Sequence, residues 1–459
     1  MKKSGIKLSA IACACSFALS ANAATTLFTN VDIFNGTEDK LYEDHHVLVI
    51  DNKIAKISKS TIKSADAMVI DGQGMTLMPG LIEGHGHLQM AGGSLSEIEN
   101  NLNWEELAVR SSANAKAALM SGFTSWRDAG GMGAGLKKAV DAELVEGPRI
   151  YPSGGFIGPT GSHADFRNLT TPNETFNGPQ SSGARLGMTI TADGVDAIKT
   201  AGRQNFMQGA TQIKIMSSGG VASQFDPWQL EAYSDDEIQA AVQVANAYGS
   251  YVMSHAYSKQ AIMRNLENGV KSIEHGFSFD AEIAELMEEK GAYMTTNMQA
   301  FSPLLGQVSA ISASPASARK AASAQAAFKD YIANVKKFRP KLGFQGDCVG
   351  LVNACQAQND HQIYLGAEFF GNFYYLKALT SVNGEILKLS GDVVDPYPEG
   401  KLGVVEVGAY ADLLLVEGNP LEDITVIGGN EKWFDAEPRN GIDTLRVIMK
   451  DGKIYKNSL

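Results

Sequence analysis

Two histidines stand two positions apart in the stretch LIEGHGHLQM, residues 81–90. His85 and His87 are two of only eight histidines in the chain, so a chance pair is a real alternative to a metal site. In a β-strand, residues at i and i+2 project from one face, and both imidazoles can then bind one metal ion, with Gly86 adding no bulk between them. The positions of the other histidines decide between the two interpretations.

Four further polar residues lie at or near the ends of predicted strands. Lys214 lies within TQIKIMSS, His255 within YVMSHAY, His275 within KSIEHG and Asp347 within LGFQGDC. Imidazole and carboxylate groups are suitable ligands for divalent ions such as zinc. Each residue also has an ordinary interpretation, which for Asp347 is a helix N-cap. Their shared placement at strand ends favours a single metal site.

Lys214 raises a separate question, because its surrounding sequence is apolar and predicts burial. A buried ammonium group without a partner is costly, so this lysine must be ion-paired, neutral or chemically altered. The ordinary interpretation is an ion pair with a nearby carboxylate. The functional interpretation is a neutral lysine that has taken up carbon dioxide as a carbamate, which supplies an anionic oxygen to each of two metal ions.

Eight short apolar or β-branched runs alternate with longer helical patterns, which is typical of βα units around a parallel sheet. The predicted strands lie in residues 76–88, 123–130, 149–155, 211–218, 251–257, 271–276, 292–298 and 342–348. Eight units over roughly 300 residues predict a (β/α)8 barrel, in which catalytic residues lie at the carboxyl ends of the strands. An open doubly wound sheet is disfavoured because no glycine-rich dinucleotide fingerprint follows the first strand.

Both ends of the chain predict antiparallel β structure. HHVLVIDNKIAKIS near the start alternates around the turn DNK, and TLRVIMKDGKIYKN near the end alternates around KDGK. The two ends most simply join into one small discontinuous domain. We therefore predict an α/β chain in which residues 24–78 and 399–459 form a β-sandwich and residues 79–398 form a TIM-like barrel.

A long Gly/Pro/Asn-rich connection, residues 156–188, is expected to overhang the site, because connections of this length are usually functional. Within it, His163 could hydrogen-bond a substrate carbonyl and Arg185 could pair with a free carboxylate. Tyr233, after the fourth strand, could reach the substrate with its hydroxyl. The alternatives are a loop-capping histidine, a surface arginine, which is favoured for Arg185, and a packed tyrosine. Residues 312–328, rich in Ala and Ser, predict a surface helix without a chemical role.

The first 23 residues predict a cleavable signal peptide. Three lysines precede or begin the apolar stretch LSAIACACSFAL, and the small residues Ala21–Ala23 precede a cleavage site before Ala24. The apolar run is short for a membrane-spanning helix of about 20 residues, so a retained anchor is the weaker alternative. We expect a periplasmic or secreted protein. Disulfides can form there, but sequence spacing leaves the pairing of Cys348 and Cys355 open.

The charge of the chain bears on its partners. The 39 basic and 51 acidic residues become 36 and 51 once the three signal-peptide lysines are removed, a net charge of −15. So acidic a chain argues against nucleic acid as a partner. We expect a small-molecule or dipeptide substrate instead, and the sequence leaves a homo-oligomer open.

The motifs together resemble the metal-dependent amidohydrolase superfamily, above all its Xaa-Pro dipeptidase and imidazolonepropionase-like branch. The similar stretches include LMPGLIEGHGHL, GFTSWRDAGG, QIKIMSSGGVAS, SHAY, SIEHG and GVVEVGAYADLLLVEGNPLEDI, and the resemblance covers most of residues 25–455. It implies a barrel with a β-sandwich and a centre of two divalent ions, zinc first among them, bridged by carboxylated Lys214. The implied remaining ligands are His85, His87, His255, His275 and Asp347. The chain departs from the family at Gln345-Gly346-Asp347, where Gly-Thr-Asp is usual.

Such a site predicts amide or peptide hydrolysis. Two divalent ions lower the pKa of a shared water and polarise the scissile carbonyl, while Asp347 can accept the proton of the water and deliver it to the leaving amine. We expect a dipeptidase or carboxypeptidase-like enzyme that acts on Xaa-Pro or N-acyl amino acids. The alternatives are a mononuclear deaminase or cyclic-amide hydrolase on the same fold, which does not need Lys214, and a binding protein with a catalytically impaired site.

Overall fold

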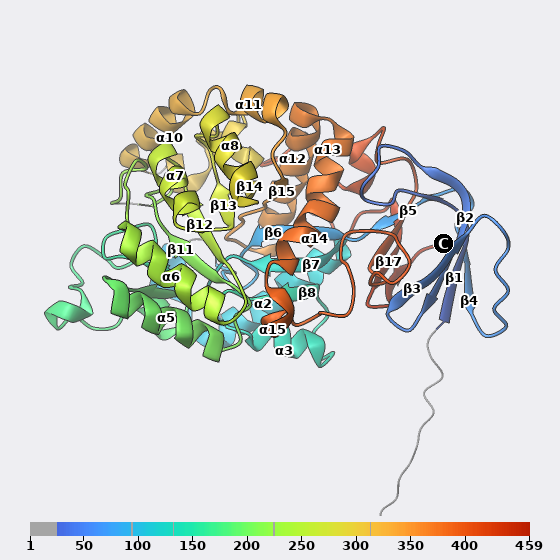
Figure 1. Ribbon diagram of the computed structural model, residues 1–459, viewed down its shortest axis with the longest axis horizontal. Coiled ribbons are helices and arrows are strands. Elements are labelled where there is room, and N and C mark those ends of the chain that lie inside the picture. Colours follow the sequence, from blue (N-terminus) through green and yellow to red (C-terminus); the bar gives the residue numbers. More distant parts are fainter. Residues whose placement is uncertain (1–24, 93–94, 132, 224, 313) are drawn as a thin grey trace, which may run out of the picture.

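The chain folds into a barrel and an adjoining β domain, which lie side by side in the computed structural model (Figure 1). The structure describes residues 25–459 apart from 93–94, 132, 224 and 313. The predicted signal peptide, residues 1–23, lies outside the described residues. Among the helices described, none is both long and apolar enough to cross a membrane.

The barrel contains the eight parallel strands that the sequence predicted. They are β6 (Leu81–Gly86), β7 (Phe123–Asp128), β8 (Arg149–Tyr151), β11 (Ile213–Met216), β12 (Val252–Ala256), β13 (Ser272–His275), β14 (Tyr293–Thr296) and β15 (Leu342–Phe344). Backbone hydrogen bonds close the ring at both seams, because the Asp347 amide donates to the His85 carbonyl and the Thr211 amide donates to the Pro152 carbonyl. The predicted (β/α)8 fold is confirmed.

The third strand of the barrel is interrupted. The run at residues 149–155 forms β8, and after Pro152 the chain continues into β9 (Phe156–Gly158), which pairs with β11 and with β10 (Thr189–Thr191). The connection that was expected to be a loop therefore begins as a strand. It also contains η1 (Glu174–Phe176) and α4 (Ser182–Arg185), and Glu99 of α1 (Leu95–Asn100) accepts two backbone amides of α4.

Helices cover the outside of the barrel (Figure 1). The longer ones are α2 (Trp104–Met120), α5 (Val195–Met207), α6 (Asp235–Ala247), α7 (Lys259–Glu267), α8 (Ala281–Lys290), α10 (Pro315–Ala327), α11 (Tyr331–Phe338) and α12 (Val352–Phe370). Local signals explain where they begin: Asn103 caps α2, and Ser234 forms a capping box with Glu237 at α6. The shorter ones are α3 (Gly135–Asp141), η2 (Met298–Phe301), η3 (Leu305–Gln307), α9 (Ser309–Ser312), α13 (Asn372–Lys377), η4 (Ala378–Val382), α14 (Asn383–Lys388), α15 (Gly391–Val394) and η5 (Ile424–Ile427).

The β domain draws its strands from both ends of the chain, as predicted. They are β1 (Thr25–Ile33), β2 (Tyr42–Ile50), β3 (Lys53–Ser58), β4 (Met68–Asp71), β5 (Thr76–Pro79), β16 (Leu413–Val416), β17 (Leu445–Lys450) and β18 (Lys453–Asn457). They are hydrogen-bonded in the order β18-β17-β16-β5-β1-β2-β3, with β4 beside β1. Phe28 and Val47 from the first segment share one apolar core with Leu413 and Val447 from the last. Neither end can bury this core alone.

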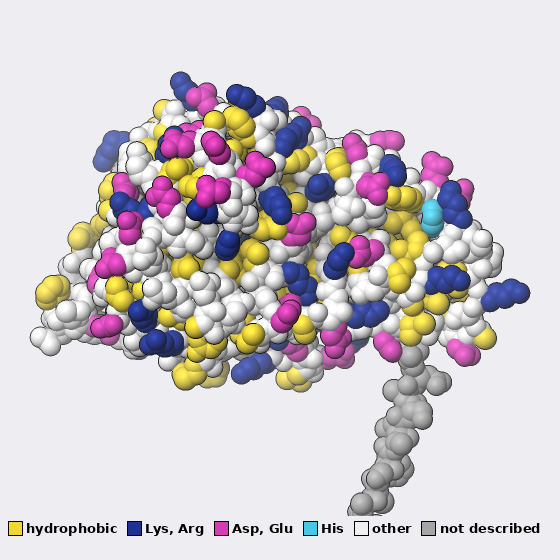
Figure 2. Space-filling model, in the orientation of Figure 1, with side chains coloured by type: hydrophobic (Ala, Val, Ile, Leu, Met, Phe, Trp, Pro, Cys, Tyr) yellow, Lys and Arg dark blue, Asp and Glu magenta, His cyan; other side chains and the backbone are white. Residues whose placement is uncertain are grey.

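Acidic and basic side chains are interspersed over the face of the molecule seen in Figure 2. The net charge of the whole chain is −12, and no continuous basic surface is visible on this face. A nucleic-acid-binding protein presents clustered lysines and arginines to the phosphate backbone. The face in view therefore has no such cluster.

Candidate metal centre

The structure brings polar side chains from strands far apart in the sequence to one end of the barrel. Ligand atoms of His85, His275 and Asp347 lie within 4.8 Å of one another. His87 Nε2 lies 3.1 Å from Asp347 Oδ1, and Lys214 Nζ lies 3.4 Å from His85 Nε2. Five of the six predicted metal ligands thus form one cluster at the carboxyl ends of the strands.

His255, the sixth predicted ligand, lies at the edge of this cluster. Its ring centroid is 4.5 Å from that of His275. Its Nε2–H donates a hydrogen bond to the Gly219 carbonyl at 3.0 Å. In the tautomer that makes this bond, Nδ1 keeps its lone pair and is the atom that can bind a metal ion.

Groups outside the cluster set the orientation of the first two histidines. His85 Nδ1–H donates to Glu274 Oε2 at 2.6 Å, and His87 Nδ1–H donates to the Gly130 carbonyl at 2.9 Å. In both rings the Nε2 lone pair then faces the cluster, as metal-binding histidines require. For His87, the Nε2 lone pair then faces a carboxylate oxygen of Asp347. Because both atoms are acceptors, a contact this short needs a cation between them or a proton on the ring.

Glu274 belongs to a buried charge network that the sequence did not reveal. Arg127 donates to both of its carboxylate oxygens, at 3.0 and 2.9 Å, and to Ser272 Oγ at 2.9 Å. The side chains of Arg127 and Glu274 are both fully buried, from strands β7 and β13. A charged residue inside an otherwise apolar strand run, as in FTSWRDAG and SIEHG, was the available signal.

His275 and Asp347 both have left-handed backbone conformations, with φ of 72° and 50°. Non-glycine residues adopt this region rarely, and functional sites are where such strain gathers. Gln345 Nε2 and Asn297 Oδ1 lie 2.9 and 3.0 Å from His275 Nδ1, so that the tautomer of the ring decides which of the two forms the hydrogen bond. Gln345, where the chain departs from the family pattern, therefore contacts a histidine of the site directly.

Glu83 ties the two strands that carry most of the cluster. Its Oε1 accepts the backbone amide of His85 at 2.9 Å and that of Gly346 at 2.8 Å. Burial raises the pKa of its carboxyl to about 8, despite these two hydrogen bonds. The carboxyl holds β6 against the end of β15 and so fixes His85 relative to Asp347.

Burial decides the protonation states of the cluster. It lowers the pKa of the His85 and His255 imidazoles well below their usual range and that of His275 to about 4. Burial alone would raise the pKa of Asp347, but the contact with His87 and the other nearby histidines bring it below its usual value. Neutral imidazoles around an ionised carboxylate are the forms that bind metal ions.

Lys214 lies in the middle of β11 with 1% of its surface exposed. Burial lowers the pKa of its ammonium group to about 8. Over the part of the chain that the structure describes, no carboxylate lies within ion-pairing distance of its Nζ. The ordinary interpretation of Lys214, an ion pair with a nearby acid, therefore lacks its acidic partner among the described residues.

Of the three predicted substrate-binding residues, His163 lies beside the cluster. Its ring stacks on that of His255 with centroids 4.3 Å apart, and its Nδ1 lies 3.5 Å from Asp226 Oδ2. The buried Tyr233 hydroxyl donates to the Ala192 carbonyl at 3.1 Å. Arg185 is exposed and donates to two groups of its own loop. The structure brings only His163 against the proposed ligands.

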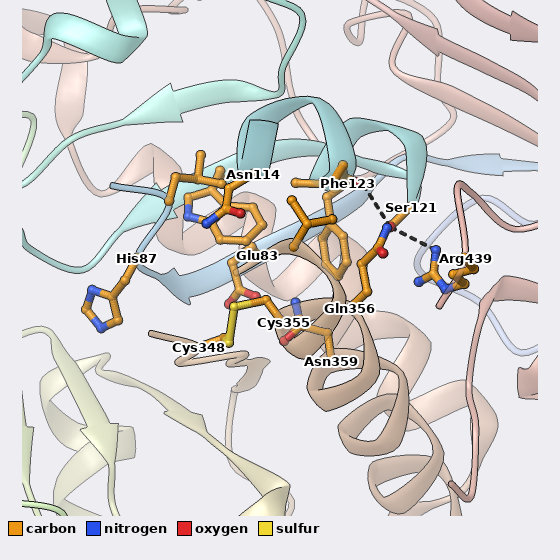
Figure 3. A pocket seen from close by; sticks show the side chains of 15 residues that line it. Glu83, His87, Asn114, Ser121, Phe123, Cys348, Cys355, Gln356, Asn359 and Arg439 are labelled. Carbon is orange, nitrogen blue, oxygen red and sulfur yellow. Dashed lines mark hydrogen bonds between the residues drawn. A yellow bond between two sulfur atoms is a disulfide. The ribbon is translucent and has the colours of Figure 1, made fainter. Parts of the chain in front are cut away.

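A small cavity of about 40 Å³ lies between β6, α2 and α12 (Figure 3). Its wall includes Glu83, His87 and a disulfide between Cys348 and Cys355. The pairing that sequence spacing left open is therefore present. The bridge follows Asp347 directly and joins the end of β15 to the first turn of α12.

Residues 76–356, more than half of the chain, match the model of the amidohydrolase family. The chain belongs to this family. The amidohydrolase is 27% identical to ochratoxinase of Aspergillus niger over 387 residues, which cover 83% of this chain and 75% of the relative. It is also similar to the crystal structure of a prolidase complexed with N-methylphosphonate-L-proline, with 34% identity and a TM-score of 0.82 over 95% of this chain and 100% of the prolidase. A Xaa-Pro dipeptidase with methionine bound in its active site gives 27% identity and a TM-score of 0.78 over the same shares.

These similarities confirm the superfamily, its dipeptidase-like branch and the barrel with a β domain from both ends. They also confirm that this amidohydrolase is a hydrolase of amide bonds, acting on small molecules. Its residues His85, His275 and Asp347 can hold a metal ion.

Proposed function

We propose that this amidohydrolase is a binuclear metal enzyme that removes the C-terminal amino acid from Xaa-Pro dipeptides or N-acyl amino acids. One observation carries the proposal: Lys214 is buried beside His85 without a carboxylate partner within ion-pairing distance among the described residues. A single-metal site has no need of a lysine at this position. The similarity to a prolidase crystallised with a proline-containing phosphonate supports the substrate class.

The donor set fits two divalent ions, and we propose zinc, although cobalt and manganese accept the same ligands. The residues that would hold them are His85, His87, His255, His275, Asp347 and carboxylated Lys214. The neutral Lys214 amine would bond through its nitrogen lone pair to the carbon of carbon dioxide, with one C–O π pair moving onto oxygen, and one N–H proton would pass to water. The resulting carbamate would carry one negative charge shared by its two oxygens, which would be its ligand atoms for the metal ions.

When bound, the metal ions would lower the pKa of the attacking water and polarise the scissile carbonyl. Asp347 holds the first proton: its ionised carboxylate accepts it from the water and then donates it to the leaving nitrogen. We assign to His163, whose ring stacks on that of His255, a hydrogen bond donated to the carbonyl oxygen as that oxygen gains negative charge. The product amine leaves with its free carboxylate.

We further propose export to the periplasm or the medium. The disulfide between Cys348 and Cys355 supports it, because such bridges persist in oxidising compartments and are rare in the cytosol.

The test is a screen of the purified protein, supplied with zinc and bicarbonate, against a library of dipeptides and N-acyl amino acids. We expect released amino acid from one C-terminal class and two zinc ions per chain. Lys214→Ala should abolish release and lower the zinc content, whereas Lys138→Ala on the exposed side of α3 should change neither. Full hydrolysis by Lys214→Ala contradicts the binuclear centre. No release across the library, from protein that holds two zinc ions, contradicts the substrate class.

A further inference from the structure

Lys320 of helix α10 organises a segment of the barrel mouth that follows β11. Its Nζ donates to the backbone carbonyls of Gly220, Ser223 and Asp226 at 2.9, 2.6 and 2.8 Å. A lysine ammonium has three donors, and here each one has a backbone carbonyl from the same short segment. Lys320 is half-buried, so water competes weakly for these donors.

The segment that Lys320 holds contacts two histidines of the site. The Gly219 carbonyl accepts from His255 Nε2 at 3.0 Å. Asp226 Oδ2 accepts the Gly220 amide at 2.6 Å and lies 3.5 Å from His163 Nδ1. Burial alone would raise the pKa of this carboxyl, but the adjacent His163 brings it down to about 2. The carboxylate is therefore an anion next to the ring that stacks on His255.

Gly220 of this segment packs directly against the His163 ring. A Cβ atom added at Gly220 would lie 2.2 Å from His163 Cε1 and 2.3 Å from its Nδ1. A shift of Gly220 toward His163 would therefore displace the His163 ring, and with it the stacked pair.

Helix α10 has a second attachment to the same region. Trp228 Nε1 donates to Ser323 Oγ at 3.3 Å, and its ring packs edge-on against Phe328 with centroids 5.3 Å apart. Phe328 also contacts Phe277, two residues after His275. Helix α10 is thus held by Trp228 as well as by the carbonyls, and Phe328 at its C-cap connects it to the residues that follow β13.

We propose that Lys320 is a positioning residue of the active site, which acts through residues 219–223, 225 and 226 to hold His163 and His255 in place. The sequence had indicated a surface helix without a chemical role. The proposal rests on the function proposed above, because it assigns metal binding to His255 and carbonyl recognition to His163. Among the described residues, the hydrogen bonds of Lys320 go to the three backbone carbonyls and to Ser223 Oγ at 3.5 Å, so any effect on the two histidines passes through the segment.

The experiment compares Lys320→Met, which removes the charge and the donors but keeps the length, with Lys320→Arg, which keeps the charge and several donors. Arg319→Met is the matched control, since Arg319 is the exposed neighbour on α10. Zinc affinity, kcat, KM and the midpoint of thermal unfolding are measured for each protein. We expect Lys320→Met to lower zinc affinity and kcat by about 10-fold or more, by analogy with residues that orient metal ligands. Lys320→Arg should recover part of the loss, and Arg319→Met should match the wild type.

A lower unfolding temperature in Lys320→Met with unchanged zinc affinity and kcat would show a purely structural role and overturn the proposal. Should Lys320→Met fail to fold, Lys320→Gln replaces it, because glutamine has no charge and is too short to reach all three carbonyls. Zinc affinity and kcat equal to those of the wild type in Lys320→Gln would then overturn the proposal. If the wild type hydrolyses nothing, the proposed function fails, and the zinc affinities still decide whether Lys320 positions His255.

Discussion

Glu274 and Arg127 lie behind the ligands yet decide how His85 faces the cluster. Glu274 accepts from His85 and from Arg127, and both charged side chains are fully buried. A buried charge pair of this kind adds little net stability, but it becomes costly when one partner is removed. The pair therefore couples metal binding to the stability of the barrel.

Replacing Glu274 with glutamine should weaken both properties. The variant leaves the buried Arg127 without its counter-charge, so the free energy of unfolding should fall by about 3–5 kcal/mol. Zinc affinity should fall about 10- to 100-fold, because glutamine has one uncharged acceptor oxygen in place of the two carboxylate oxygens that serve His85 and Arg127, and so fixes the His85 tautomer less well. Denaturant unfolding and zinc titration measure the two effects. Glu288→Gln, an exposed residue of α8, is the control, and an equal zinc affinity in both variants would contradict the role given to Glu274.

Lys214 predicts a stability that depends on pH in the metal-free, carbon-dioxide-free protein. Its pKa is about 8 when folded and about 10.5 when unfolded, so the unfolded chain binds the proton more tightly. The cost of burying the charge is fully present below pH 8 and disappears as the pH rises to 10.5. Lys214→Met should therefore be more stable than the wild type at pH 7, by about 3 kcal/mol from this ionisation.

Urea unfolding of the two proteins between pH 7 and 10.5 measures this difference. We expect the advantage of Lys214→Met to shrink steadily above pH 8. A difference that stays constant over this range would mean that the folded and unfolded chains bind the lysine proton equally, so that burial does not lower the pKa of Lys214.

The sequence predicted the residues of the cluster because each one follows or ends an apolar run. It did not predict the Arg127–Glu274 pair, whose members are 147 positions apart and lie inside strands. Residue type alone cannot distinguish a buried charge with a partner from one without. The same limit applies to Tyr233, whose position after β11 was predicted, but whose hydroxyl orientation depends on the Ala192 carbonyl.

The elements of the barrel were predicted where their apolar runs are long. The strands β9 and β10 were missed because each has only three residues within a Gly/Pro-rich stretch, too few for any periodicity to appear. Helix α10 was predicted as a helix from its alanines, but its attachment to the site through Lys320 depends on tertiary contacts. Local composition thus indicates the type of an element and not the neighbours it will have.

The connection between β15 and α12 carries the disulfide, and removing this bridge should lower the free energy of unfolding. Cys348 and Cys355 are seven positions apart, and closing so short a loop stabilises the folded state by about 2–3 kcal/mol in the chain-entropy model. The double variant Cys348→Ser/Cys355→Ser should unfold at a lower denaturant concentration. Turnover should also fall, because Asp347 directly precedes the bridge. Reductant should destabilise the wild type and leave the variant unchanged; equal sensitivity of both proteins would contradict the assignment.

The barrel and the β domain are joined by buried charge as well as by the chain. Arg149 of β8 donates to Asp412, just before β16, at 3.0 Å, and it also contacts Asp451 at the turn between β17 and β18. Asp412 accepts the Asp451 amide at 2.7 Å, and Lys450 donates to the Gly147 carbonyl at 2.8 Å. The last segment of the chain is therefore fixed to the amino end of a barrel strand, away from the metal cluster.

Arg149→Met should separate the stability of the whole molecule from its chemistry. The substitution leaves Asp412, which is 4% exposed, without its counter-charge, so unfolding should require about 3–5 kcal/mol less free energy. Arg446→Met removes a more exposed pair with Glu417 and should cost at most about 1 kcal/mol. In Arg149→Met/Asp412→Asn the uncompensated charge is gone, and part of the lost stability should be recovered.

Zinc content and kcat, measured well below the unfolding transition, should remain those of the wild type in all three variants, because Arg149 lies at the end of its strand opposite the cluster. A fall in kcat that parallels the fall in stability would mean that the β domain contributes to the geometry of the site as well as to the fold.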